Sequence, residues 1–527
     1  MDANSKDAKN NKLSRRDFLK DMTIGSVVVA GSGLLTGCNS NSQDTGLPKE
    51  WDYETDVVVI GSGAAGMSAA VEVVEAGKSV LVLEQYEVLG GATGGSGVYS
   101  AWSSKLNLPQ PVQGVEDNAE LMFADSMKAS GNMADPEQVR LMCEQSPDAI
   151  NFLLDHGCEF VDTLRPAEGR NGQGRYVLKI AGTLSPALLP HVEKGGKLLL
   201  GTKFTEIIKQ DPPGNRVIGI KAVDKDGKEL NIKARQGIIL ATGMWIDDEK
   251  MLLRHWPTLS QEIIEIDRTF AGLGLPFGPF TGEAIRAAQR LGASTRHMDY
   301  FGGEVYYATP EYLLKGVAIA GLTRMPNEVH INLNGQRFYD EGKTRGSMAE
   351  DVFKQPEATY FVVEDGNLIP GSLMPWAPME KIEEWVAAGY MVRGNTIDEL
   401  AAELESKFNI PATAVVETLT NYNSYCDTGV DKEFGKAKVF LTKLDTPPFY
   451  VSPPQTAKAE YTYGGVDANM NAQVLDLDGE VIPGLYAAGM CAGGHFGKDS
   501  ILGNYQINAV VFGRIAGKNA AAEAPWS

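Results

Sequence analysis

A short glycine-rich segment, Gly61-Ser62-Gly63-Ala64-Ala65-Gly66, carries the residue types needed to hold a pyrophosphate through the backbone. It follows an apolar run at 57–60 and precedes a run of small, helix-forming residues that ends near Gly77. In this pattern the first glycine makes a tight turn and the second lets the backbone approach the phosphates. The third glycine packs the helix on the strand, and the helix N-terminus faces the negative charge.

An acidic residue completes this pattern. A second apolar run at 79–83 is followed by Glu84, about 20 residues after the glycine loop. At this spacing in the pattern, a carboxylate accepts hydrogen bonds from the adenosine ribose. Continuous apolar runs are typical of parallel strands that are buried on both faces of a sheet. The order strand, glycine loop, helix, strand and acid therefore predicts a Rossmann-type sheet that binds a dinucleotide.

A second glycine-rich loop at 90–97 indicates which dinucleotide is bound. A nicotinamide site needs one pyrophosphate loop, whereas an extended FAD needs further close backbone along its ribityl chain. The strand at 237–243 ends in Ala-Thr-Gly, and the strand at 483–489 ends in Ala-Ala-Gly. Both are typical of FAD domains of the glutathione-reductase type, so FAD is the predicted cofactor.

From about Asp52 onward the chain resembles the flavoprotein family of fumarate reductase and succinate dehydrogenase, which includes urocanate and cinnamate-type reductases and 3-ketosteroid dehydrogenases. Besides the glycine loops, the marks of this family lie at 240–243, 281–293, 331–341 and 511–517. The resemblance implies an α/β fold, a glutathione-reductase-type FAD-binding Rossmann domain interrupted by an α+β capping domain. We expect the FAD-binding domain at 52–297 and 459–527, with the capping domain at 298–458.

The predicted FAD contacts combine the glycine loops with the matching family positions: Gly61, Ser62, Gly63, Ala65, Gly66, Glu84, Gly91, Ala92, Thr93, Gly97, Thr242, Gly243, Glu283, Gly489, Met490, Tyr505 and Gln506. The loop after Glu84 has no histidine where membrane-bound relatives attach flavin covalently, which implies non-covalent FAD. Met490 stands where relatives often have glutamate, so one side-chain contact to the flavin is expected to be missing.

The resemblance also assigns a proton donor. The segment from Arg337 to Arg345 matches the family pattern RF-x-[ND]-E-x-x-x-R, and Arg345 matches the arginine that protonates the substrate carbon. A guanidinium suits this role if a carboxylate can reprotonate it. Glu341 could belong to such a relay if 341–345 is helical. An Arg345–Glu341 ion pair on a surface helix is the structural alternative.

The substrate positions depart from the dicarboxylate-reducing pattern. The family's His-Thr-Met-Gly-Gly is replaced here by a segment beginning at Tyr461 and containing Tyr463, and its second carboxylate-binding arginine aligns with Ser500. A site that lacks this bidentate arginine binds a second carboxylate poorly. We therefore expect a larger, flatter and partly apolar unsaturated substrate rather than fumarate. We interpret His495 as structural.

The first residues resemble an export signal. Arg15-Arg16-Asp17-Phe18-Leu19-Lys20 and the weakly apolar run at 22–37 resemble a twin-arginine signal, and Leu-Thr-Gly-Cys38 resembles a lipoprotein box. We expect residues 1–37 to be a signal peptide, Cys38 to be lipidated and 38–51 to be a linker. The expected location is the extracytoplasmic face of the cell membrane.

Composition excludes several other classes. The net charge of −20 disfavours nucleic-acid partners. The five cysteines form no CxxC or CxxCH motif, so we predict no metal site and no built-in haem or iron–sulfur cluster. Electrons must then come from an external donor, such as a membrane cytochrome. Two alternatives to an activated-alkene reductase remain: a ketosteroid-type dehydrogenase working oxidatively, and a non-enzymatic anchored binding lipoprotein.

Overall fold

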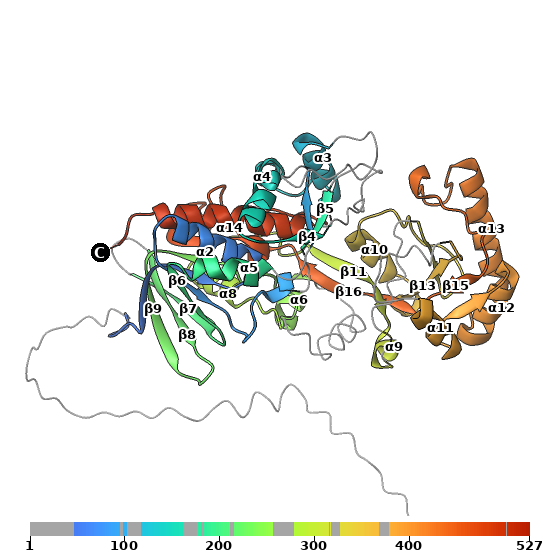
Figure 1. Ribbon diagram of the computed structural model, residues 1–527, viewed down its shortest axis with the longest axis horizontal. Coiled ribbons are helices and arrows are strands. Elements are labelled where there is room, and N and C mark those ends of the chain that lie inside the picture. Colours follow the sequence, from blue (N-terminus) through green and yellow to red (C-terminus); the bar gives the residue numbers. More distant parts are fainter. Residues whose placement is uncertain are drawn as a thin grey trace, which may run out of the picture. The chain divides into compact units, whose positions relative to one another are not determined.

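The computed structural model is built around an eight-stranded sheet in the order β18-β19-β9-β1-β2-β6, with β8 and β7 continuing from β9 (Figure 1). Strands β19, β9, β1, β2 and β6 are parallel, and β18, β8 and β7 join antiparallel. The strands are β1 Tyr53–Ile60, β2 Val80–Leu83, β6 Gly196–Leu199, β7 Lys203–Lys209, β8 Val217–Val223, β9 Glu229–Leu240, β18 Gln473–Leu475 and β19 Val481–Ala487. The expected parallel sheet is therefore confirmed.

The structure describes residues 47–94, 98–102, 117–161, 176–180, 184–210, 216–256, 279–315, 317, 327–367, 379–501 and 503–526. The predicted export signal and Cys38, together with Gly97 of the second glycine loop, lie outside these residues.

The sheet is covered on both faces, as its apolar strands require. Val57 and Val59 of β1 pack into one core, and Val58 and Ile60 pack into a second core on the opposite face. The first core includes the helices α2 Ala64–Glu75, α3 Ala119–Ala129, α4 Pro136–Asp155, α5 Leu184–Val192 and α14 Asn504–Ala522. The second includes α6 Glu249–His255 and α8 Glu283–Arg290.

Helices α2 and α14 lie side by side over the sheet (Figure 1). Two glycines of α14 allow this close contact: a Cβ at Gly513 or Gly517 would lie 2.4 Å from the carbonyl oxygen of Ala65 or Ala69. This packing brings the start of α14, with Tyr505 and Gln506, next to the glycine loop near the beginning of the chain.

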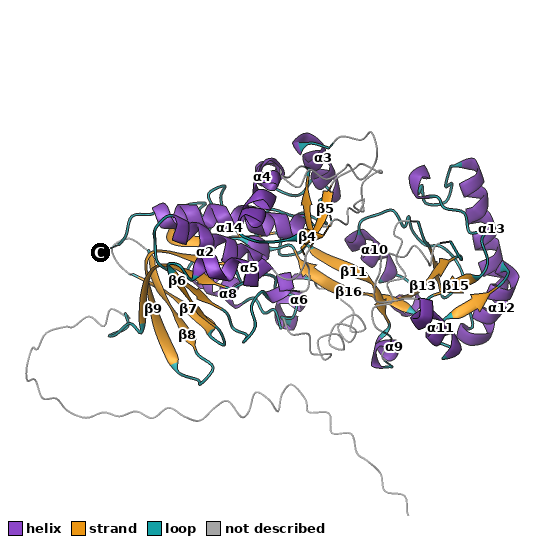
Figure 2. Ribbon diagram, viewed as in Figure 1, coloured by secondary structure: helices purple, strands orange, loops and turns teal. Residues whose placement is uncertain are grey.

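The insertion forms a second sheet, and its helices lie around these strands (Figure 2). All its pairings are antiparallel, in the order β11-β16-β13-β15-β14 with β12 on β13. The strands are β11 Phe301–Ala308, β12 Val329–Asn332, β13 Thr359–Glu364, β14 Val392–Gly394, β15 Phe449–Val451 and β16 Gln455–Thr462. The helices are α9 Pro310–Leu314, α10 Arg345–Val352, α11 Met379–Ala387, α12 Ile397–Phe408 and α13 Ala412–Thr428.

Helix α12 shows how local sequence defines an element of this insertion. Thr396 caps its N-terminus by accepting a hydrogen bond from Glu399 N at 3.1 Å, and Asn409 ends it in the left-handed conformation at φ 56°. The bounds of α12 therefore follow from local capping residues. The insertion predicted at 298–458 begins just before β11 and ends within β16, and these boundaries remain predictions.

Two smaller sheets complete the fold. Strand β10 Thr295–Arg296 pairs with β17 Gly465–Val466, while β3 Val98–Ala101 and β4 Phe160–Val161 both pair with β5 Tyr176–Ile180. None of the described helices combines the length and hydropathy that crossing a bilayer requires. The described residues also contain no group of three His, Cys, Asp or Glu side chains arranged to hold a metal ion.

Candidate active site

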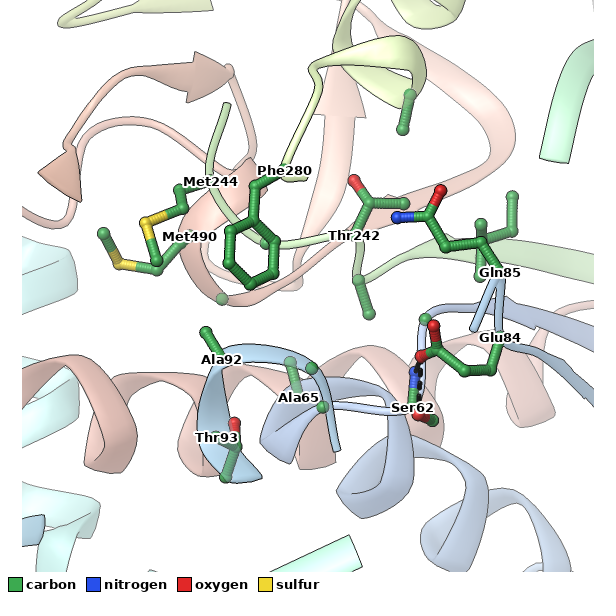
Figure 3. Close-up of a pocket in the computed structure, with 18 of the residues that line it drawn as sticks. Ser62, Ala65, Glu84, Gln85, Ala92, Thr93, Thr242, Met244, Phe280 and Met490 are labelled. Atoms are coloured by element: carbon green, nitrogen blue, oxygen red, sulfur yellow. Dashed lines mark hydrogen bonds between the residues drawn. The ribbon is translucent and has the colours of Figure 1, made fainter. Parts of the chain in front are cut away.

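A cavity lies at the carboxyl ends of the parallel strands, where ligands of open α/β sheets bind (Figure 3). Most of the predicted FAD contacts line it. These are Gly61, Ser62, Gly63, Ala65, Glu84, Gly91, Ala92, Thr93, Thr242, Gly243, Glu283, Gly489, Met490, Tyr505 and Gln506. Residues from Gly61 to Gln506, which are 445 positions apart in the chain, are therefore brought to one cavity by the order of the strands.

The three glycines of the first loop have the geometry that the pattern predicts. Gly61 has φ +107°, and a Cβ there would lie 2.4 Å from Ala241 O. At Gly66 a Cβ would lie 1.9 Å from Gly61 O, so this residue packs the helix on the strand and does not line the cavity. A Cβ at Gly63 would have 3.5 Å to its nearest neighbour. Gly63 therefore keeps free the space that a close-lying phosphate would use.

Glu84 holds the loop and retains acceptor capacity. Its Oε2 accepts hydrogen bonds from Ser62 N at 3.1 Å and Ser62 Oγ at 2.6 Å, and its Oε1 accepts one from Tyr86 N at 3.1 Å. A carboxylate offers about four acceptor sites, so one remains for a ribose hydroxyl. Ser62 Oγ in turn accepts a bond from Gly90 N at 3.0 Å, which links the two glycine loops.

The cavity is polar at one end and apolar at the other. Figure 3 shows Glu84, Gln85 and Ser62 together at the polar end, and Met244, Met490 and Phe280 at the opposite end. This separation fits a ligand that has a hydroxyl-rich ribose at one end and a flat, largely apolar ring system at the other. Met490 supplies an apolar contact where many relatives are expected to have a carboxylate.

Sequence reasoning missed several lining residues. They are Gln85, Tyr86, Thr202, Lys203, Phe204, Met244, Phe280 and Thr281. Lys203 Nζ lies 3.1 Å from Glu283 Oε1. Burial alone would raise the pKa of Glu283, but the Thr281 hydroxyl and the Lys203 ammonium lower it. Three of them carried a local signal: Gln85 and Met244 are next to the motif residues Glu84 and Gly243, and Thr281 lies within the family mark at 281–293.

The lining residues fit a non-covalent flavin. A Cβ at Gly91 or at Gly243 would meet no atom within 4 Å, so the backbone borders open space on both sides of the cavity. The described lining residues include no histidine or cysteine that could form a bond to a flavin ring.

Acid treatment of the purified protein is therefore expected to release about one FAD per chain into solution, because contacts with backbone and neutral side chains are lost on unfolding. Absorbance of the supernatant and of the washed precipitate after trichloroacetic acid measures this. Flavin that stays with the precipitated polypeptide would contradict the non-covalent assignment.

The predicted substrate tyrosines gather beside this cavity. Tyr505, which lines the cavity, stacks on Tyr461 with ring centroids 4.6 Å apart and lies 6.0 Å from the ring of Tyr463. Phe496 contacts both Tyr463 and Tyr505 edge-on or tilted. Ser500 is buried in the same region, at 7% exposure. Burial raises the pKa of the Tyr463 hydroxyl well above 10, so this group is a neutral hydrogen-bond donor at physiological pH.

Arg345 is the first residue of α10, and its side chain lies outside the described part of the structure. The proposed relay required residues 341–345 to be helical, and this requirement is not met, because α10 begins only at Arg345. Instead, the Glu341 carboxylate binds the Arg337 guanidinium at 2.8 and 3.0 Å and lies 3.3 Å from Lys436 Nζ. Arg337 and Lys436 are buried cations of the capping domain, and the Glu341 carboxylate is directed toward them.

His495 is buried against Phe512, with ring centroids 4.2 Å apart. Neither of its ring nitrogens has a hydrogen-bond partner among the described residues. Burial lowers its pKa to about 3, so this histidine is neutral at physiological pH. These surroundings agree with the structural interpretation.

The parallel sheet, the two glycine loops and the cavity at the strand ends define a dinucleotide-binding flavoprotein. The chain belongs to the FAD binding domain family, whose model matches residues 56–500. FAD as the cofactor is thereby confirmed.

Known proteins of similar sequence and structure extend this assignment. Urocanate reductase of Eggerthella lenta is 30% identical over 491 residues, which cover 90% of this chain and 76% of that protein. The open conformation of a flavocytochrome c3 fumarate reductase superposes with a TM-score of 0.64 at 25% identity, covering 90% of this chain and 79% of that one. A 3-ketosteroid-delta4-(5alpha)-dehydrogenase from Rhodococcus jostii, in complex with 4-androstene-3,17-dione, gives 0.69 at 26% identity, with 90% and 98% coverage.

The chain is therefore an FAD-dependent oxidoreductase, and the expected FAD-binding fold with its inserted α+β segment is confirmed. The non-enzymatic alternative is wrong, because the FAD binding domain match and the relatives named as reductases and dehydrogenases indicate an enzyme.

Proposed function

We propose that this protein reduces an activated C=C bond in an enoate or enone that is larger than fumarate, with electrons from an external donor. The observation that carries the proposal is the position of the tyrosines. Tyr505 borders the cofactor cavity, and Tyr461 and Tyr463 stack beside it. Tyr461 stands where dicarboxylate-reducing relatives are expected to have a histidine.

The chemistry needs one hydride and one proton for each double bond. FAD held in this cavity would, once reduced, supply the hydride to the β-carbon of the alkene. The negative charge that develops on the α-carbon then requires a proton and a positive field. Arg345 is the proposed donor, because it matches the family pattern and its backbone stands at the start of α10. The hydroxyl of Tyr463 is neutral and carries no charge to hold a carboxylate, and its proton is donated to Asp499 Oδ1 at 3.1 Å.

The size and charge of the site support the choice of substrate. Tyr461 and Tyr505 are only partly buried, and their rings offer flat faces on which an aromatic or polycyclic substrate can stack, whereas Tyr463 and Phe496 are buried. Ser500 replaces the arginine that would hold a second carboxylate bidentately. The relatives include a urocanate reductase and a dehydrogenase solved with a steroid enone, both of which act on or bind ring-containing molecules.

Turnover of a substrate panel tests this proposal. Purified protein is expected to oxidise reduced viologen anaerobically with at least one cinnamate, urocanate or steroid enone faster than with fumarate. The reason is that Ser500 stands where a second cationic side chain would bind the second carboxylate of fumarate. Comparison of kcat/KM across the panel gives the measurement. Fumarate as the best substrate would overturn the interpretation of Ser500 and Tyr461.

A ketosteroid-type dehydrogenase working in the oxidative direction is the second candidate. The structural likeness to the ketosteroid dehydrogenase favours it. However, those relatives are expected to have a tyrosine near each of the positions of Arg345 and Ser500. This chain has no tyrosine at either position. A second assay with a saturated ketosteroid and an artificial electron acceptor, run beside the panel, separates the two functions. An oxidative enzyme would reduce the acceptor and would be slow with reduced viologen and enones.

The proposed location is the extracytoplasmic face of the cell membrane. The twin-arginine motif at Arg15-Arg16 and the Cys38 lipobox support it. A lipid-anchored enzyme would lie close to a membrane cytochrome that could supply its electrons. We therefore propose the lipid anchor and the external donor together.

Fractionation of cells tests the location. The double change Arg15→Lys and Arg16→Lys is expected to leave the protein in the cytoplasm, and Cys38→Ala is expected to release exported protein from the membrane. A serine replacement outside the box, Asn39→Ser, serves as control. Unchanged membrane association of the Cys38 variant would contradict the lipobox.

A further inference from the structure

Asp499 lies at the junction between the C-terminal cofactor-binding segment and α10 of the capping domain. Its side chain is 3% exposed. Its Oδ2 accepts hydrogen bonds from Ser347 N at 2.9 Å, from Ser347 Oγ at 3.3 Å and from the Thr344 hydroxyl. All these donors come from the first turn of α10 and the residue that caps it. One carboxylate oxygen is thus occupied entirely by the capping domain.

The other oxygen of Asp499 faces the cofactor side. Oδ1 accepts hydrogen bonds from Ser500 N at 2.7 Å and from the Tyr463 hydroxyl at 3.1 Å. The Tyr463 and Tyr505 hydroxyl oxygens are 3.0 Å apart and share a further hydrogen bond. Because Tyr505 lines the cofactor cavity, a continuous chain of hydrogen bonds runs from this cavity to the start of α10.

The turn that contains Arg345 wraps closely around this carboxylate. A Cβ at Gly346 would lie 2.5 Å from Asp499 Oδ1, so the backbone can approach only because residue 346 is glycine. Arg345 stands between the two residues, Thr344 and Ser347, whose donors bind Asp499. The backbone of Arg345 is consequently fixed by its neighbours on both sides.

We propose that Asp499 is a positioning residue, which sets the backbone of Arg345 relative to the cofactor cavity by binding the first turn of α10 and Tyr463 at the same time. The inference rests on the proposed function, in which Arg345 donates the proton. It adds a residue that acts through Arg345 and makes no contact with the substrate.

The chemistry of the side chain explains why a carboxylate is needed. Five donors converge on the two oxygens, and each oxygen receives one backbone N–H, from Ser347 or from Ser500. In Asp499→Asn, the amide NH2 must face one of these two N–H groups, because an amide has only one acceptor oxygen. The variant therefore loses the N–H bond from Ser347 on the α10 side or the N–H bond from Ser500 on the cofactor side, since a hydroxyl can turn to accept from the amide and a backbone N–H cannot. A negative charge next to the N-terminus of α10 is also favourable.

Asp499→Asn is expected to bind FAD at one per chain and to be reduced by viologen at the wild-type rate. Oxidation of the reduced enzyme by the best alkene of the panel should slow by about 10-fold or more, with substrate Kd changed only a few-fold, because a shift of about 1 Å in a catalytic group costs this much or more. The solvent deuterium isotope effect on this step should rise, since proton transfer becomes more rate-limiting.

Two further variants define the control and the milder case. Asp476→Asn makes the same chemical change in a turn, where Asp476 accepts bonds from Asp478 N and Glu480 N at 2.9 Å, and is expected to leave the rate unchanged. Thr344→Val removes a single donor to Asp499 and should give a several-fold loss with the same isotope signature. This milder variant keeps the test decisive if Asp499→Asn does not fold.

The double variant Asp499→Asn with Arg345→Ala separates the possible failures. If Asp499 acts through Arg345, the second change adds less than about 3-fold to the effect of Arg345→Ala alone. An independent, multiplicative effect would overturn the positioning role, as would wild-type rates in both Asp499→Asn and Thr344→Val. If Arg345→Ala alone is as fast as wild type, it is the proposed proton donor that fails.

Discussion

Arg345→Ala is expected to slow alkene reduction by about 10²–10⁴-fold, the range for loss of a general acid. The loss should fall on the oxidative half-reaction, in which the α-carbon takes its proton. Reduction of the bound flavin by viologen should stay normal, since this step needs no proton from Arg345. Stopped-flow measurement of the two half-reactions under anaerobic conditions gives both rates.

Two variants frame this result. Arg345→Lys should recover only part of the rate, because an ammonium lacks the planar fork of the guanidinium. Arg393→Ala removes an exposed arginine from β14 of the same domain, 3.6 Å from Glu383, and should leave the rate unchanged. An Arg345→Ala enzyme within a few-fold of wild type would show that the proton comes from a tyrosine or from water.

Glu341→Ala is expected to lower the free energy of unfolding by about 3–5 kcal/mol, the cost of breaking a buried ion pair from one side. Glu341 is 1% exposed, and its loss would leave the Arg337 guanidinium with fewer anions and Lys436 without its carboxylate partner. Denaturant unfolding followed by tryptophan fluorescence measures the change. Glu384→Ala, which removes an exposed partner of Lys381, should cost only ~0–1 kcal/mol.

The same variant distinguishes a structural Glu341 from a catalytic one. Folded, FAD-loaded Glu341→Ala should reduce the alkene within a few-fold of the wild-type rate, because Glu341 binds Arg337 and shares no helix with Arg345. A loss as large as that of Arg345→Ala, at full FAD occupancy, would restore Glu341 to the proton relay.

Acid should remove the contribution of Glu341. Burial alone would raise the pKa of Glu341, but the charges of Lys436 and Arg337 lower it to about 2. Since this folded-state pKa lies below the unfolded value of about 4.5, the stabilisation is present above pH 4.5 and is lost as the pH falls toward 2. The difference in stability between wild type and Glu341→Ala should therefore shrink over this pH range.

The cofactor half of the protein could be predicted from sequence because its determinants are local. Gly61, Gly63 and Gly66 are required by one turn and one helix start, and the apolar run of β1 needs no distant partner to be recognised as a buried parallel strand. Glu84 follows at a distance set by one helix and one strand. A pattern that encodes backbone conformation can be recognised in the sequence alone. Nearly all the FAD-contact positions predicted from it line the cavity.

The capping domain and the junction were decided by tertiary structure. Glu341 was placed with Arg345 by its spacing, yet it pairs with Arg337 and with Lys436, almost a hundred residues later in the chain. Asp499 bonds to Ser347 and Tyr463, which lie 152 and 36 residues earlier in the chain, and Lys203 of β7 pairs with Glu283 of α8. Apart from the Arg337–Glu341 pair, whose members are four residues apart, these contacts have no period and no fixed spacing. They form because buried charges and donors must find partners among whichever groups the packing of the strands and helices brings within reach.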